Sequence, residues 1–219
     1  MPGPFLSELD AAAVEELRRL AVRRSWLAGA ALFHEGDVAD SVLIIETGIA
    51  KAIVTAEDGS EVALALRGPG DILGELAAVG GGRRSASVYA VEAITALTVE
   101  VASFREYLQR HPSATFVLLA ALADRSRDAT RRHAEFGAFD TTVRLARLIA
   151  ELADTYGEPT DAGVRVRLLS QDELASFCAA SREAVARALR TLREEGLIET
   201  GRRTVTVVDL ARLRDWRPG

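Results

Sequence analysis

The chain has 219 residues, a length that favours one or two domains. Its 48% apolar and 27% charged residues are ordinary for a folded globular protein and exclude a disordered chain. The net charge of −5 by itself does not indicate a nucleic-acid partner. The C-terminal residues 138–219 are neutral, with 13 Arg against 13 Asp plus Glu.

Two further features exclude whole classes of protein. The longest stretch without Asp, Glu, Lys or Arg, from His111 to Ala123, has thirteen residues, whereas a membrane span needs about 20. The N-terminus also lacks the basic and apolar regions of a signal peptide, so we expect no membrane segment. Cys178 is the single cysteine, which excludes an intrachain disulfide and a four-cysteine iron–sulfur cluster and fits a cytoplasmic protein.

A helix is predicted near the N-terminus, because Leu9, Ala13, Leu17 and Leu20 recur at a helical period. Ser7, with Asp10 three residues later, resembles a capping box for this helix.

From Trp26 to Ala102 the pattern changes to short runs of Val, Ile and Leu broken by Gly. Asp58-Gly59 stands between two such runs and is a hairpin signal. Short strands with turns every 8–12 residues or so indicate a β-sandwich or jelly roll.

One stretch of this β-rich region carries candidate binding chemistry. Glu75 follows Gly74, and nine positions after the acid, beyond three consecutive glycines, Arg84 precedes Ser85. An acid that accepts from hydroxyls and an arginine followed by a small hydroxyl suggest a ligand with a sugar edge and a phosphate. The alternative is a surface hairpin whose glycines merely form a turn.

A long helix is predicted after His111-Pro112. Its apolar and small residues recur in steps of three and four, which is typical of a coiled-coil seam. This seam consists of Leu119, Leu122, Ser126, Ala129, His133 and Phe136. It faces either a second copy of the chain or the β domain, and we favour a homodimer because a long charged helix between two domains has few other places to bury the stripe.

The C-terminal region has the signals of a winged helix. Asp140 is placed to cap one helix, and Ser170 with Glu173 forms a capping box for a short second helix. The run "CAAS" then predicts a turn that ends at Ser181, the cap of a third helix, and "GLIETGRRTVTVV" predicts a small β wing.

The third helix begins with Arg182 and Glu183 and carries Arg187 about one turn further on. Helix-turn-helix units present this end of their second helix to the major groove, where arginine reads guanine and glutamate accepts from the cytosine amino group. A winged helix that binds only protein is the alternative.

These segments together resemble the cyclic-AMP receptor protein/FNR (Crp/Fnr) family of bacterial transcription regulators. The resemblance rests on a β-rich domain with Gly74-Glu75-Leu76 and Arg84-Ser85-Ala86, a long helix, and the run "SREAVARALRTLREEGLI", and it covers nearly the whole chain in order. It implies an α+β fold with a jelly-roll cyclic-nucleotide-binding domain over residues 1–112, a dimerisation helix over 113–138 and a winged helix-turn-helix DNA-binding domain over 139–219.

The resemblance also implies roles for single residues. Glu75 would accept from the ribose 2′-hydroxyl, and Arg84 and Ser85 would hold the cyclic phosphate with backbone N–H groups at the start of the short helix "ELAAV". Arg125 matches a residue that supports the ligand acid, and Thr130 one that contacts the purine edge. The expected ligand set for cyclic AMP or another cyclic nucleotide is Gly74, Glu75, Leu76, Arg84, Ser85, Ala86, Arg125 and Thr130.

For DNA, the resemblance implies that Arg182, Glu183 and Arg187 read palindromic half-sites similar to TGTGA, and that Ser181 belongs to the same DNA-binding end of the helix. The wing arginines Arg202 and Arg203 would contact phosphates. A homodimer that works with RNA polymerase is implied as well.

Two positions depart from the family pattern. Ala129 stands where cyclic-AMP responders often carry a polar residue, and Ala179 stands in the turn where glycine is common. The cysteine cluster of the oxygen-sensing branch is absent, and His34, His111 and His133 lack the spacing of haem or metal ligands, so we expect no metal.

An enzyme is not expected, because the sequence has no nucleophile–base pair, no acids paired by spacing and no metal cluster. Two alternatives to a cyclic-nucleotide-responsive regulator stay open: a Crp/Fnr-type regulator that answers to another small ligand or to none, and a cyclic-nucleotide-binding regulatory subunit with a protein partner.

Overall fold

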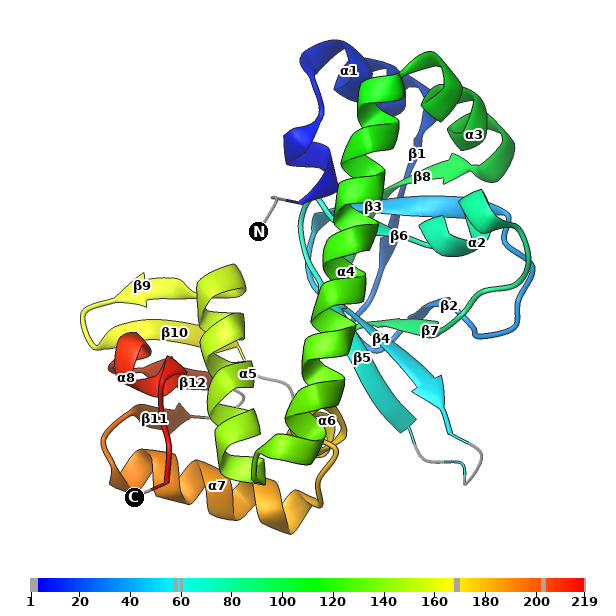
Figure 1. Ribbon diagram of the computed structural model, residues 1–219. Coiled ribbons are helices and arrows are strands. Elements are labelled where there is room, and N and C mark those ends of the chain that lie inside the picture. The colour runs from blue at the N-terminus through cyan, green and yellow to red at the C-terminus, as the bar shows by residue number, and fades with distance from the viewer. Residues whose placement is uncertain (1–3, 57–58, 60, 168–169, 202–203, 219) are drawn as a thin grey trace. The chain divides into compact units, whose positions relative to one another are not determined.

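The computed structural model describes residues 4–56, 59, 61–167, 170–201 and 204–218, except the side chains of Phe136 and Arg167 (Figure 1). The chain divides into two compact units, Met1–Ala129 and Thr130–Gly219. The long helix α4 (Pro112–Ala138) contributes to both units.

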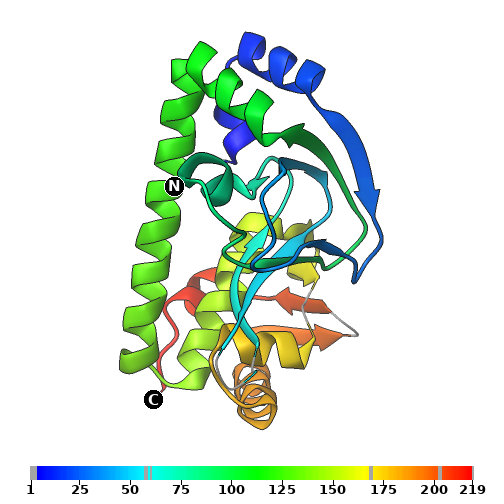
Figure 2. The ribbon, with the colours of Figure 1, turned by 90° about the vertical axis from the view of Figure 1, so that its right-hand side faces the viewer.

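The first unit contains two four-stranded antiparallel sheets (Figures 1 and 2). One sheet has the order β1 (Val22–Trp26), β8 (Ile94–Glu100), β3 (Ser41–Thr47), β6 (Ile72–Leu73), and the other has β2 (Ala31–Phe33), β7 (Ser87–Ala90), β4 (Ala50–Thr55), β5 (Glu61–Arg67). The helical elements are η1 (Phe5–Glu8), α1 (Ala11–Leu20), α2 (Glu75–Gly80), α3 (Val101–Arg110) and the first part of α4.

Strand β3 shows how the core is built. Its side chains alternate: Val42 and Ile44 belong to a core cluster with helices α1, α3 and α4, while Leu43 and Ile45 belong to the cluster between the two sheets. Because both faces of the strand are buried, its sequence is a continuous apolar run rather than an alternating one. The two stacked sheets confirm the predicted α+β fold with a jelly-roll domain.

The prediction that Ser7 caps the first helix is wrong. The cap of α1 is Asp10, whose carboxylate accepts from the Ala13 N–H at 2.9 Å, whereas the Ser7 hydroxyl donates to the Pro4 carbonyl at 2.7 Å. Ser7 lies in η1, which is held away from α1 because Phe5 is buried and the Leu6 N–H bonds the Gly70 carbonyl.

The hairpin prediction is confirmed for the strands that flank it, since β4 and β5 pair antiparallel. Asp58 of the predicted turn lies outside the described residues.

The second unit packs helices against a small antiparallel sheet. The helices are α5 (Thr141–Tyr156), α6 (Gln171–Phe177), α7 (Arg182–Glu194) and α8 (Leu210–Arg214), and the sheet has the order β11 (Ile198–Gly201), β12 (Thr204–Val207), β10 (Gly163–Arg167), β9 (Glu158–Thr160). Helix α5 packs on α7, α8 and β10. The predicted turn and wing are thereby confirmed as the α6–α7 connection and the β11–β12 hairpin.

The predicted caps of this unit are confirmed. The Asp140 carboxylate accepts from the N–H groups of Thr142 and Val143, Ser170 and Glu173 form a reciprocal capping box, and Ser181 accepts from the Ala184 N–H. Across both units, no helix of the described residues is long and apolar enough to cross a membrane.

Candidate functional site

The acid of the first candidate site is placed by an unusual backbone at Gly74. This residue joins β6 to α2 with φ of 79°, in the left-handed region that favours glycine. A Cβ atom here would also collide with the Arg84 guanidinium and lie 3.2 Å from the Phe33 ring. Position 74 therefore requires glycine for two reasons: the left-handed backbone conformation and the close approach of the Arg84 guanidinium.

Glu75, the first residue of α2, is 4% exposed and forms an ion pair with Arg125 of α4. The Arg125 Nη1 donates to Glu75 Oε1 at 2.6 Å, and its Nη2 donates to the Ile72 carbonyl at 2.8 Å. The arginine thus fixes one carboxylate oxygen and the neighbouring strand end together, and these two bonds do not use Oε2.

Arg84 is also 4% exposed and is held from several sides. Its Nη2 donates to the Ser41 carbonyl at 2.7 Å and to the Asp40 carboxylate at 3.2 Å, and its Nη1 donates to the Gly74 carbonyl at 3.2 Å. The guanidinium lies 3.7 Å from the centre of the Phe33 ring. Burial lowers the pKa of Arg84, and the charge and hydrogen bond of Asp40 oppose that shift.

A guanidinium has five N–H donors, and three of them are used in these contacts. These contacts leave one donor on Nε and one on Nη1. Asp40 differs from the other partners because its side chain is 86% exposed, so an incoming phosphate could replace it.

The structure therefore brings Glu75, Arg84 and Arg125 together around Gly74. Ser85 and Leu76 are exposed beside them, and Ala86 is half-buried. Thr130, by contrast, is an exposed residue of α4 that belongs to the second unit.

Sequence reasoning missed Phe33, Asp40 and the Ser41 carbonyl as supports of Arg84. They lie more than forty positions before the arginine, and no local pattern connects them. The only available signal was indirect: an arginine in a strand-rich core must find a carboxylate and carbonyl oxygens.

The second candidate site is the N-terminal end of α7. Ser181, Arg182, Glu183 and Arg187 are all exposed there. Hydrogen bonds from its own backbone N–H and from the Ser181 hydroxyl lower the pKa of Glu183, so its carboxylate is charged at neutral pH. An exposed end with two cations and one anion can meet both acceptors and donors on base edges.

Arg182 also faces an acid, since its Nη1 lies 3.7 Å from the Asp172 carboxylate of α6. Both side chains are more than half exposed, so the pair is easily separated. Arg202 and Arg203 of the wing lie outside the described residues.

The turn in front of α7 is strained at Ala179. Its φ is +43°, and it is the one residue other than glycine with a positive φ in the described part of the chain. This is the position at which the family pattern often has glycine, a residue that adopts a positive φ without strain. Cys178 beside it is buried, and burial raises the pKa of its thiol to about 12.

The described residues hold no group of three or more His, Cys, Asp or Glu side chains that could bind a metal ion.

Two family models match the chain. One describes a cyclic nucleotide-binding domain and covers residues 23–111, and the other describes a Crp-like helix-turn-helix domain and covers residues 143–216. A CRP-like cAMP-activated global transcriptional regulator of Mycobacterium tuberculosis is 31% identical over 186 residues, which are 84% of this chain and 83% of the relative. The chain belongs to the Crp/Fnr family.

Further Crp/Fnr proteins are similar over most of their length. The cyclic AMP receptor protein of Thermus thermophilus is 31% identical over 193 residues, 88% of this chain and 87% of the relative. A solved transcriptional regulator of the CRP family from the same species superposes with a TM-score of 0.74 at 27% identity, covering 88% of this chain and 95% of that one.

These comparisons confirm the family prediction. The chain is a Crp-like transcription regulator with a cyclic nucleotide-binding domain and a DNA-binding helix-turn-helix domain, and it is not an enzyme.

Proposed function

We propose that this Crp/Fnr protein is a homodimeric, cyclic-AMP-responsive regulator that binds palindromic DNA with half-sites similar to TGTGA. The observation that carries the proposal is that Glu75 and Arg84, nine positions apart in sequence, are buried on either side of Gly74 within the cyclic nucleotide-binding domain. Two relatives that are 31% identical are named for cyclic AMP, which favours this nucleotide over others.

In the proposed complex each residue has one task. Glu75 Oε2 accepts from the ribose 2′-hydroxyl while Arg125 keeps the acid oriented. Arg84 donates to the cyclic phosphate, which takes the place of the exposed Asp40 carboxylate on Nη2, and the exposed Ser85 hydroxyl donates beside it. Gly74, Leu76 and Ala86 shape the backbone around these groups, and Thr130 contacts the purine edge.

Calorimetric titration with cyclic AMP, cyclic GMP and cyclic CMP tests this ligand assignment. We expect the tightest binding for cyclic AMP and a larger loss for Arg84→Ala than for Ser85→Ala, because only the arginine makes a charge-assisted contact. Absence of heat with every nucleotide, or an Arg84→Ala variant that binds as the wild type does, would contradict it.

The dimer is proposed to form through residues 113–137 of α4. Leu119 is 54% exposed in the single chain, and Ser126, Ala129 and His133 are exposed too, whereas Leu122 packs partly on the core of the first unit. The side chain of Phe136 lies outside the described residues.

Leu119→Glu is therefore the better test of the seam than a change at Leu122, because it leaves the core intact. Light scattering should report about twice the chain mass of 23.5 kDa for the wild type and a single chain mass for the variant. A monomeric wild type at micromolar concentration would contradict a dimer.

Base reading is assigned to the exposed end of α7. We propose that Arg182 and Arg187 read the G·C pairs of the half-site, that Glu183 accepts from a cytosine amino group and that the Ser181 end of the helix approaches the backbone. Loss of Arg187 should cost about 1–3 kcal/mol of binding free energy and relax the preference at one guanine.

The wing arginines Arg202 and Arg203 are proposed to contact phosphates, so their replacement should weaken all sequences alike and reduce the salt dependence. Selection from a random duplex library tests both roles. Recovery of no palindrome, or of a palindrome unchanged by Arg187→Ala, would contradict the reading residues.

A regulatory subunit with a protein partner is the weaker proposal, because such a subunit needs neither the exposed end of α7 nor a Crp-like helix-turn-helix domain. Since members of this family act on DNA, we also propose a cytoplasmic location and contact with RNA polymerase.

A further inference from the structure

Arg144 connects three parts of the second unit through one side chain. It lies in the first turns of α5 and is half-buried. Its Nε donates to the Cys178 carbonyl at 3.0 Å, its Nη1 to the Phe139 carbonyl at 2.5 Å, and its Nη2 to the Thr141 hydroxyl at 3.4 Å. One guanidinium thus joins the α4–α5 connection to the turn between α6 and α7.

The Cys178 carbonyl directly precedes Ala179, the strained residue of that turn. Because the peptide group is planar, holding this oxygen orients the plane between Cys178 and Ala179, the plane from which the φ rotation of Ala179 starts. That angle is the strained one, at +43°. Ser181, the cap of α7, follows two residues later, so the direction in which α7 leaves the turn depends on the same plane.

We propose that Arg144 is a positioning residue for DNA reading: by holding the Cys178 carbonyl against the α4–α5 connection, it keeps Ala179 in its left-handed conformation and aims the N-terminal end of α7. The proposal rests on the assignment of base reading to α7. It adds a residue that does not touch DNA and acts through the turn.

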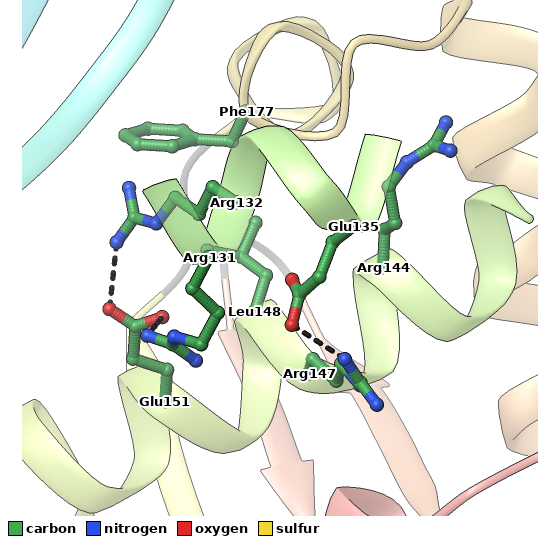
Figure 3. Close-up of a pocket in the computed structure, with 8 residues that line it drawn as sticks. All are labelled: Arg131, Arg132, Glu135, Arg144, Arg147, Leu148, Glu151 and Phe177. Carbon is green, nitrogen blue, oxygen red and sulfur yellow. Dashed lines mark hydrogen bonds and ion pairs between the residues drawn. The ribbon is translucent and has the colours of Figure 1, made fainter. Parts of the chain in front are cut away.

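Arg147 supplies a matched control on the same helix. Its Nη1 donates to Glu135 Oε1 at 2.5 Å and its guanidinium lies 4.1 Å from the centre of the Phe139 ring. Figure 3 shows Arg147 directed at Glu135, while Arg144 points away from that pair. Both arginines are half-buried and contact the end of α4 or its connection, but the bond to the turn is made by Arg144.

Two further contacts, in the pocket that Figure 3 shows, hold α4 to α5 without involving the turn between α6 and α7. Arg132 donates to Glu151 at 2.8 Å, and Arg131 lies 3.9 Å from the same acid. Since these pairs and the Glu135–Arg147 pair secure the two helices, loss of Arg144 should loosen the turn selectively and leave the packing of α4 on α5 in place.

The experiment compares Arg144→Gln, Arg144→Lys and the control Arg147→Gln in the full chain. Lysine keeps the charge, but its donors lie on one nitrogen and cannot span two carbonyls as the planar guanidinium does. Because Arg144→Lys keeps the positive charge, it still tests the bond to the turn if Arg144→Gln fails to fold. Two quantities are measured: the dissociation constants for the selected operator and for a random duplex, and the amide hydrogen exchange of the segment 176–184.

We expect both Arg144 variants to lose about tenfold in operator affinity, the effect of one charge-assisted hydrogen bond, with little change for random DNA. Exchange in 176–184 should become faster, while Arg147→Gln should match the wild type in both measurements. Wild-type exchange and selectivity in the Arg144 variants, or equal losses in Arg147→Gln, would overturn the proposal. Exchange is read without DNA, so it tests Arg144 even if α7 proves to read no operator.

Discussion

The strained backbone at Ala179 predicts that an alanine-to-glycine substitution stabilises the protein, the reverse of its usual effect. Replacing alanine by glycine normally destabilises a protein, but Ala179 has φ of +43°. The left-handed conformation costs about 1–2 kcal/mol for a residue with a Cβ atom, whereas the added chain entropy of glycine costs about 0.5–1 kcal/mol. Because Ala179 is exposed, no apolar contact is lost. Ala179→Gly should therefore stabilise the second unit by about 0.5–1 kcal/mol.

The two tryptophans allow the measurement to be made on that unit alone. Trp216 is buried in the second unit and Trp26 lies in the first, so a Trp26→Phe background leaves one local reporter. For a unit of this size the expected gain raises Tm by about 2–8 °C. The control is Ala180→Gly, whose backbone is ordinary and which should lower Tm. A lower Tm for Ala179→Gly would refute the strain argument.

Three further predictions concern Gly74, Asp40 and Cys178. Gly74→Ala, which places a Cβ against Arg84 in a left-handed backbone, should lower cyclic-nucleotide affinity at least tenfold in calorimetry; unchanged binding would contradict the geometry. Asp40→Asn removes an exposed carboxylate that competes with phosphate for Arg84, so affinity should rise about two- to tenfold, and a loss would assign Asp40 a supporting role. Cys178, with its pKa raised to about 12, should resist iodoacetamide at pH 8 until the second unit unfolds; rapid labelling of the folded protein would contradict its burial.

Local signals predicted much of this fold from the sequence. The caps at Asp140, Ser170 and Ser181 involve residues at most three positions apart, and all are present. The prediction for Ser7 failed because long-range contacts position η1, the segment before α1. Phe5 is buried in the core and the Leu6 N–H bonds the Gly70 carbonyl, and neither contact can be inferred from the residues next to Ser7.

The site divides in the same way. The occurrence of Glu75 and Arg84 on either side of a glycine-rich segment is visible as a pattern, and Arg125 could be assigned by resemblance. The supports of Arg84 at Phe33 and Asp40, and the bond from Arg144 to Cys178, are contacts between segments more than thirty positions apart, which the tertiary fold alone creates.

In the proposed function, a cyclic nucleotide held by Glu75 and Arg84 controls DNA binding by α7. Fluorescence anisotropy of a labelled operator, titrated with the wild type and with Arg84→Ala in the presence and absence of cyclic AMP, tests it most directly. We predict that cyclic AMP tightens operator binding of the wild type at least tenfold and leaves Arg84→Ala at the affinity of the ligand-free protein. Equal operator affinity of the wild type with and without each cyclic nucleotide would contradict the claim.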